Sequence, residues 1–293
     1  MWKIWLITTD HLEEELWFRD EEDFKVGMNF VAIQAACSQK TDAEAVILAF
    51  ILMSNHVHFV LKGTYADVER FIFQFKQRYS MYMRHRWGVK EFLRGNGVQI
   101  KEIPFDDEAP ERAIAYVQMN CVAANICAHP SQYPWGTGNL FFNQTKVTGT
   151  PLKELSARKK AMLLHTNFTN LPGHWHLSPE GYIPPQEYVD SETVEAIFRT
   201  PKRMNYFYAS SSKARKRVES EEHLPAFRDQ IILAALPDLL RSLFGKESFL
   251  GLSAPERSEF MRQVRFRFSA DINQIARVCG LSYADAARLI DTV

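Results

Sequence analysis

The sequence predicts an α+β fold in which a small antiparallel sheet carries helices on one face and is followed by a mainly helical region. The first observation is that residues 3–9, 45–53, 56–63 and 98–104 have the periodicity and bounding turn residues of strands. The second is that residues 22–38, 65–87 and 110–127 carry apolar side chains at helical spacing. Strand, helix, two strands, helix, strand and helix in this order are expected to build a ferredoxin-like sheet.

The individual elements have their own signals. The segment 65–87 is long and amphipathic, and 110–127 has acidic residues ahead of it and Pro110 at its start, as helices often do. The strand at 56–63 is expected to be central in the sheet. Beyond these elements the sequence predicts three regions: a domain at 1–145, a linker and irregular region with a basic segment at 146–218, and a helical region at 219–293.

The composition indicates a soluble intracellular protein. At 293 residues and 46% hydrophobic, the chain is long enough for one large domain or two ordinary ones. No apolar run approaches the roughly 18 residues of a membrane span, and residues 1–7 are too short and strand-like for a signal peptide. We therefore expect a cytoplasmic protein without a membrane partner. The four cysteines show no Cys-x-x-Cys spacing, which favours free thiols over a zinc framework.

Charge is balanced overall but unevenly placed. The formal net charge is zero, which is unusual for a DNA-binding protein because such proteins neutralise phosphates. Residues 10–23 are rich in acidic side chains. The segment 199–217 has none, and it combines three aromatic residues, Tyr206, Phe207 and Tyr208, with seven basic ones: Arg199, Lys202, Arg203, Lys213, Arg215, Lys216 and Arg217. This segment is either a track for a phosphate backbone with stacking platforms for unpaired bases, or a solvated linker.

Two histidines in the strand at 56–63 form the first candidate site. His56 and His58 point to the same face because alternate side chains of a strand do so, while Val57 and Phe59 point into a core. Two neutral imidazoles side by side suit a divalent cation that also holds a substrate oxygen. The alternative is a pair of satisfied or solvent-facing histidines.

The helix at 110–127 presents a second pair of polar side chains. Tyr116 and Asn120 are four residues apart and therefore share one helix face. A nucleophile and a possible metal ligand are thus presented together.

In these motifs the chain resembles the REP-associated tyrosine transposases and related single-tyrosine insertion-sequence transposases of the HUH nuclease superfamily. The resemblance covers residues 1–145 and rests on SNHVHFVL at 54–61, AYVQMNCVAANI at 115–126, and the Tyr-Pro-Trp at 133–135. The chain departs from the family pattern in having Cys121 in place of a proline and Gly136-Thr137 in place of two serines. The family's glycine-tryptophan signature is also missing, and residues 92–97 stand in its place.

The resemblance implies an HUH nuclease fold and a DNA-cleaving, strand-transferring enzyme. His56, His58 and Asn120 would hold Mg²⁺ or Mn²⁺, and Tyr116 would attack the scissile phosphate to give a 5′ phosphotyrosine. The DNA partner would be single-stranded, with a short palindromic hairpin. The oligomeric state is left open between monomer and homodimer.

Other residues of the helix at 65–87 offer rival or accessory roles. Tyr79 and Tyr82 are alternative nucleophiles, although the phenylalanines around them favour a core or stacking role. The basic residues of this helix are candidate phosphate contacts or part of a solvated face: Lys76, Arg78, Arg84 and Arg86.

The second half of the chain carries weaker signals. His174 and His176 form another His-x-His, which the prolines and glycines nearby place in a loop. Residues 271–289 fit either a DNA-binding helix-turn-helix or a helical hairpin used in packing. For the whole chain, the alternatives to a nuclease are a non-cleaving DNA-binding regulator and an amidohydrolase-like metal enzyme, which would need a barrel.

Overall fold

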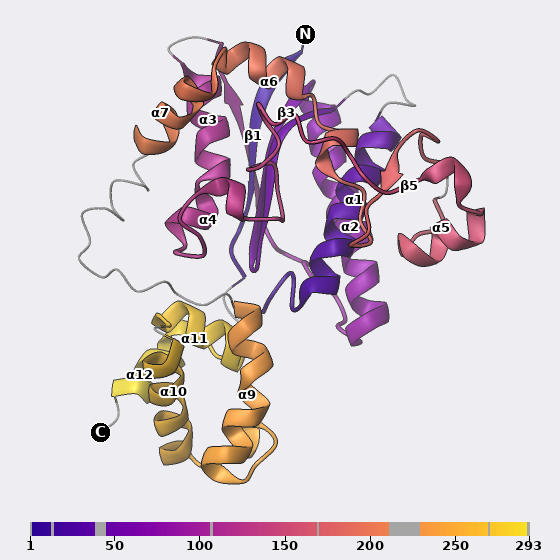
Figure 1. The fold of residues 1–293 in the computed structure, drawn as a ribbon. Coiled ribbons are helices and arrows are strands. Elements are labelled where there is room, and N and C mark those ends of the chain that lie inside the picture. Colours follow the sequence, from indigo (N-terminus) through magenta and orange to yellow (C-terminus); the bar gives the residue numbers. More distant parts are fainter. Residues whose placement is uncertain are drawn as a thin grey trace.

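The computed structural model describes residues 2–12, 15–38, 45–105, 108–168, 170–210, 229–268 and 270–291. These residues form two hydrophobic cores, one built from side chains between Ile4 and Tyr208 and the other from side chains between Ile232 and Ile290. We refer to the first unit as the sheet body and to the second as the C-terminal bundle (Figure 1). No described helix is long and apolar enough to cross a membrane, and the expected cytoplasmic location stays a prediction.

The sheet has the ferredoxin-like topology that the order of elements predicts. It consists of β1 (Lys3–Thr9), β2 (Val46–Met53), β3 (His56–Gly63) and β4 (Val98–Ile103). The strands are antiparallel and lie in the order β2-β3-β1-β4, so β3 is central, as expected. The helices α1 (Glu21–Ser38) and α2 (Tyr65–Trp87) provide the two crossover connections.

One face of the sheet is covered by α1 and α2 and forms an aromatic core. Phe59 of β3 packs edge-on against Phe71 and Phe75 of α2, with ring centroids 5.4 and 5.6 Å apart. Because side chains alternate along a strand, this contact places His56 and His58 on the other face. The start of α2 is fixed by a capping box between Thr64 and Asp67, and its end by Gly88 in the left-handed region at φ 69°.

A second helical layer covers the histidine face. It begins with α3 (Ala109–Gln118) and the single turn α4 (Asn120–Ala123), and α3 packs against β2, β3 and β4 (Figure 1). The sequence predicts one helix at 110–127, but the structure divides it at Met119. The Asn120 amide donates hydrogen bonds to carbonyls of the preceding turn, and such a side chain competes with regular helix formation. Helices therefore lie on both faces of the sheet once this layer is included.

The segment after α4 covers the outer edge of β2. Leu52 N donates to Trp135 O at 2.8 Å and Thr137 N donates to Phe50 O at 3.0 Å. A Cβ atom at Gly136 would lie 2.6 Å from Phe50 O, so only glycine fits this approach. Gly136 and Thr137 thus belong to a segment that protects an edge strand.

Residues 150–210 are more structured than the sequence predicts. They form β5 (Thr150–Pro151), α5 (Ala157–Leu163), β6 (His176–Leu177), α6 (Ser191–Phe198) and α7 (Pro201–Ser210), together with single 3-10 turns. Their buried side chains belong to the core of the sheet body, and α6 and α7 pack on α3. Of the predicted basic segment, the residues from Ser211 onward, including Lys213, Arg215, Lys216 and Arg217, lie outside the described residues.

The C-terminal bundle is helical, as predicted. It contains α9 (Asp229–Phe244), α10 (Ala254–Phe268), α11 (Ile272–Cys279) and α12 (Tyr283–Asp291), packed around a core that includes Phe260, Val264 and Ile275. Gly280 ends α11 in the left-handed region at φ 65° and lets the chain turn into α12. This turn agrees equally with a helix-turn-helix and with a packing hairpin.

Candidate histidine and tyrosine site

The two histidines of β3 lie side by side and are buried. The ring centroids of His56 and His58 are 4.7 Å apart and the ring planes are nearly perpendicular at 88°. Their exposed fractions are 6% and 1%. The strand therefore brings the two imidazoles together as its period of two predicts.

Hydrogen bonds to Nδ1 define how the imidazoles are oriented. The Asn55 amide nitrogen donates to Leu12 O at 3.2 Å, so its Oδ1 points to His56 Nδ1, 2.9 Å away. An amide oxygen only accepts, which places the proton of neutral His56 on Nδ1 and the lone pair on Nε2. His58 Nδ1 lies 3.0 Å from the hydroxyl of Thr8, its cross-strand partner. Engaged Nδ1 atoms are typical of histidines that bind a metal through Nε2.

A third histidine, which the sequence reasoning did not select, lies against this pair. His11 stacks on His56 with ring centroids 3.8 Å apart and an interplanar angle of 14°. Imidazole lone pairs lie in the ring plane, so two parallel rings do not point at one ion. His11 therefore packs on the pair in this arrangement. It stands in an acidic segment without periodicity, and no sequence signal marks it.

Tyr116 of α3 lies beside the histidines. Its ring meets that of His58 at 85°, with centroids 5.5 Å apart, and it is half-buried. Burial raises the pKa of the Tyr116 phenol above its ordinary value. At neutral pH the hydroxyl is therefore protonated, and a reaction that uses it as a nucleophile must remove the proton.

Asn120 is buried at the junction of α3 and α4. Its amide nitrogen donates to Tyr116 O at 2.9 Å and to Val117 O at 3.2 Å. Oδ1 is then the atom of this amide that is able to bind a cation. Across the residues that the structure describes, no group of three or more His, Cys, Asp or Glu side chains is arranged to hold a metal. A cation here would need an amide, water or substrate oxygen besides the two imidazoles.

The basic residues of α2 lie on the helix that covers the opposite face of the sheet, and three of them make contacts within the protein. Lys76 Nζ donates to Asn96 O, and Arg78 Nη1 donates to Thr166 Oγ1 at 3.4 Å. Burial lowers the pKa of both cations. Arg86 forms ion pairs, described below, whereas Arg84 is exposed. A phosphate contact from these residues stays a prediction and would lie away from Tyr116.

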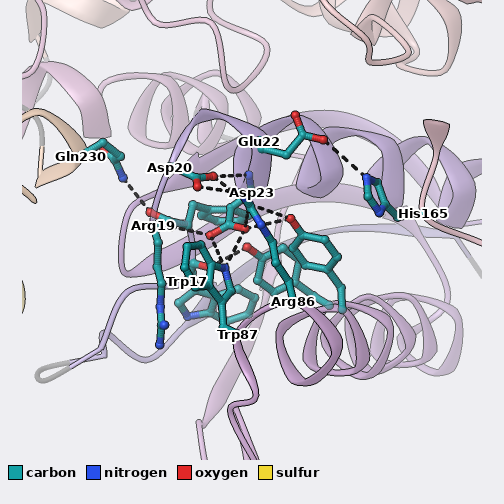
Figure 2. A network of polar contacts seen from close by, with 12 residues as sticks. Trp17, Arg19, Asp20, Glu22, Asp23, Arg86, Trp87, His165 and Gln230 are labelled. Atoms are coloured by element: carbon teal, nitrogen blue, oxygen red, sulfur yellow. Dashed lines mark hydrogen bonds and ion pairs between the residues drawn. The ribbon is translucent and has the colours of Figure 1, made fainter. Parts of the chain in front are cut away.

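Arg86 belongs to a polar network that joins α1 to α2 (Figure 2). Its guanidinium pairs with Asp20 at 2.8 Å and with the fully buried Asp23 at 2.5 Å. Asp23 also accepts hydrogen bonds from the Trp87 indole at 3.2 Å and from the Tyr82 hydroxyl at 2.9 Å. This network holds the end of α2 against the start of α1.

The rival tyrosines of α2 are committed to the core. The Tyr79 hydroxyl donates to Trp17 O at 2.6 Å, and the Tyr82 hydroxyl donates to Asp23. Burial and the neighbouring Asp23 carboxylate raise the pKa of both phenols. These positions favour a structural role over a nucleophilic one.

The second His-x-His is built differently from the first. His176 begins the two-residue strand β6, and its Nδ1 lies 2.6 Å from Glu187 Oε1, which also accepts from the His176 backbone N–H. Trp175 between the histidines is buried. The carboxylate contact ties β6 to the turn that contains Glu187.

Comparisons with known proteins give one distant likeness. No protein-family model and no curated protein matches the chain. A solved structure of a REP-associated tyrosine transposase bound to a REP hairpin is similar over 47% of this chain and 77% of that chain, with 16% identity and a TM-score of 0.32. A likeness of this size does not establish a shared activity, so the functional proposal depends on the residues of the site.

Proposed function

We propose that this chain is a metal-dependent DNA endonuclease and strand transferase that uses Tyr116 as its nucleophile. The observation that carries the proposal is the position of Tyr116, edge-on to His58 with ring centroids 5.5 Å apart, beside a buried pair of imidazoles. The order of motifs in the sequence, which resembles single-tyrosine transposases, supports the same reading.

In the proposed reaction Tyr116 Oη attacks the phosphorus of a DNA phosphodiester. A bond forms between Oη and phosphorus, the bond from phosphorus to the 3′ oxygen breaks, and that oxygen takes up a proton to leave as a 3′ hydroxyl. The product is a 5′ phosphotyrosine, whose energy is close to that of the original diester. Attack by another 3′ hydroxyl then releases Tyr116 and joins two strands without ATP.

Mg²⁺ and Mn²⁺ are hard cations that prefer oxygen ligands, so the two imidazole nitrogens need at least one oxygen ligand beside them. His56 and His58 would contribute Nε2, because Nδ1 of each is engaged by Asn55 or Thr8. Asn120 would contribute Oδ1, because its amide nitrogen is held by helix carbonyls. When bound, the cation supplies Lewis-acid polarisation of the scissile phosphate.

The protein's own part in the chemistry is to place and deprotonate Tyr116. Its helix is held on the sheet by buried residues such as Ile114 and Val117, which orient the phenol toward the histidines. Because burial raises the phenol pKa, the proton has to pass to water or another base during attack. Tyr116 is half-buried, whereas Tyr79 is fully buried.

The test is the formation of a covalent protein–DNA adduct. Wild type, Tyr116→Phe and Tyr65→Phe are incubated with labelled single-stranded hairpin oligonucleotides and Mg²⁺ or Mn²⁺, then denatured. Tyr65 is 48% exposed at the start of α2, on the opposite face of the sheet, and serves as the matched control. We expect an adduct from wild type and Tyr65→Phe with metal, and none from Tyr116→Phe.

Two results would contradict the proposal. An adduct with Tyr116→Phe would assign the nucleophile elsewhere. Hairpin binding without an adduct from wild type would favour the alternative function, a DNA-binding regulator that does not cleave. The amidohydrolase alternative is excluded by the four-stranded antiparallel sheet, because that enzyme needs a barrel.

A further inference from the structure

The C-terminal bundle contacts the sheet body at the turn that presents the histidines. Asp229, the first residue of α9, is 3% exposed and accepts a hydrogen bond from the Ser54 hydroxyl at 2.8 Å. Arg277 of α11 donates to the same carboxylate from Nε at 2.9 Å. The Asp229 carboxylate thus pairs with Arg277 of the C-terminal bundle and accepts a hydrogen bond from Ser54 of the sheet body.

A second contact from α9 reaches the segment that is bonded to this turn. Gln230 Nε2 donates to Phe18 O at 2.7 Å, and Figure 2 shows Gln230 approaching the network beside Arg19. Phe18 N and Trp17 N both donate to Ser54 O, at 3.3 and 2.8 Å. The two contacts of α9 therefore meet at Ser54, one directly and the other through residues 17 and 18.

The turn connects this junction to the histidine pair within two residues. Ser54, Asn55 and His56 are consecutive, and Ser54 and Asn55 are both buried. The orientation of the Asn55 amide, fixed by Leu12 O, decides which nitrogen of His56 carries the proton. A displacement of Ser54 would move Asn55 and weaken its hydrogen bond to His56.

We infer that the C-terminal bundle controls the histidine pair by docking on this turn, with Asp229 as a positioning residue that acts on His56 through Ser54 and Asn55. The hydrogen bonds described above cross the junction from hydroxyl to carboxylate and from amide to carbonyl, and the two bodies have separate hydrophobic cores. Polar junctions between bodies of one chain permit relative motion. Docked, the bundle holds His56 in the tautomer that carries its proton on Nδ1; undocked, it releases that constraint.

The effect of docking on the His56 tautomer does not depend on the proposed function. The expected effect of docking on metal binding and DNA cleavage rests on the proposed function. Ser54→Ala is the sharpest variant because it removes the donor on the histidine side and leaves the Asp229–Arg277 pair intact. Ser80→Ala is the matched control, since the Ser80 hydroxyl donates to Phe92 O at 2.7 Å within the same body but away from the turn.

The first readout is made on full-length, metal-free protein at alkaline pH. Imidazole ¹⁵N chemical shifts report the tautomer of His56, and hydrogen exchange reports the opening of residues 54–57. We expect the Nδ1–H form in wild type and Ser80→Ala. In Ser54→Ala we expect His56 to be a mixture of the two tautomers. We also expect the amide hydrogens of residues 54–57 to exchange about tenfold faster, because a hydrogen bond to a charged group is lost.

Asp229→Asn provides an independent route to the same result, since it weakens the acceptor without touching the turn. Mn²⁺ titration of each variant is expected to show affinity lower by about threefold to tenfold, with the double variant Ser54→Ala/Asp229→Asn no worse than the more affected single. Unchanged His56 shifts and unchanged exchange in both single variants would overturn the inference. If the tautomer responds while wild type forms no DNA adduct, the docking inference stands and the nuclease proposal fails.

Discussion

The two faces of the sheet carry tyrosines in opposite circumstances. On the α1–α2 face, Tyr79 and Tyr82 are buried, and their hydroxyls donate to Trp17 O and Asp23. On the α3 face, Tyr116 is half-buried and lies against a histidine. One face uses the phenol to satisfy buried polar groups, and the other leaves it accessible beside two imidazoles. Residue type alone therefore says little about a tyrosine's role, and its surroundings say much more.

The histidine pairs show the same contrast. His56 and His58 are two buried rings with hydrogen bonds to uncharged partners at Nδ1. His176, in the second pair, is 2.6 Å from a carboxylate that also binds its backbone. The first arrangement engages Nδ1 of each ring with a neutral polar group, whereas the second fastens a short strand to a turn. Substitutions in both tyrosine sets and both histidine pairs test these contrasts.

The largest effect is expected from exchanging the tyrosines of the two faces for phenylalanine. Tyr116→Phe should lower the rate of DNA cleavage by a thousandfold or more, on the order of nucleophile deletions in other enzymes. Tyr82→Phe should leave that rate within about threefold, because the lost hydroxyl lies on the other face. Single-turnover cleavage of a labelled hairpin measures both. Equal losses in the two variants would show that the faces do not differ in function.

Substitution of one histidine from each pair by alanine should give the next largest effect on metal binding and cleavage. His56→Ala is expected to weaken Mn²⁺ binding by about a hundredfold and to lower cleavage at subsaturating metal to the same extent, since removal of a ligand or its support typically costs this much. His176→Ala should change neither. Calorimetric Mn²⁺ titration, followed by cleavage at saturating metal, separates binding from chemistry. Loss of Mn²⁺ binding in His176→Ala alone would move the metal site to the second pair.

A stability measurement tests the structural character of the α1–α2 face. Arg86→Ala leaves Asp23 buried without its cation, and we expect the free energy of unfolding to fall by about 2 kcal/mol, less than for a fully buried pair because Arg86 is partly exposed. Arg84→Ala, exposed on the same helix, should change it by less than about 0.5 kcal/mol. Urea denaturation measures both. In buffer without urea, the Arg86→Ala protein should still form the Tyr116 adduct.

A dependence of cleavage on pH tests the ionisation of Tyr116. Burial raises the pKa of Tyr116 above its ordinary value, so the neutral phenol dominates through pH 9 and the phenolate fraction grows about tenfold per pH unit below the pKa. Cleavage limited by phenolate should therefore rise with pH between 7 and 9. The ¹³Cζ shift of Tyr116 gives its ionisation directly in the metal-free protein. A flat rate profile would mean that proton removal does not limit attack.

Much of the candidate site was predictable from local pattern. The period of a strand places His56 and His58 on one face, and the structure agrees. Helical spacing places Tyr116 and Asn120 on one face of their helix, but the position of Tyr116 beside the histidines depends on how α3 packs on the sheet. His11 and Thr8 were not predictable in this way, because they reach the site by a ring stack and a cross-strand pairing that join residues about 45 to 50 positions apart.

The order of strands and helices, the topology that follows from it, and the shared face of the two histidines can be derived from the amino-acid sequence, because each depends on periodicity within a short segment. Three features required the folded structure: the half-burial of Tyr116, the ion pairs of Arg86 with Asp20 and Asp23, and the contact of Asp229 with Ser54 across 175 positions. Such contacts depend on how distant segments pack, and packing is set by the fit of whole surfaces, which no local repeat records.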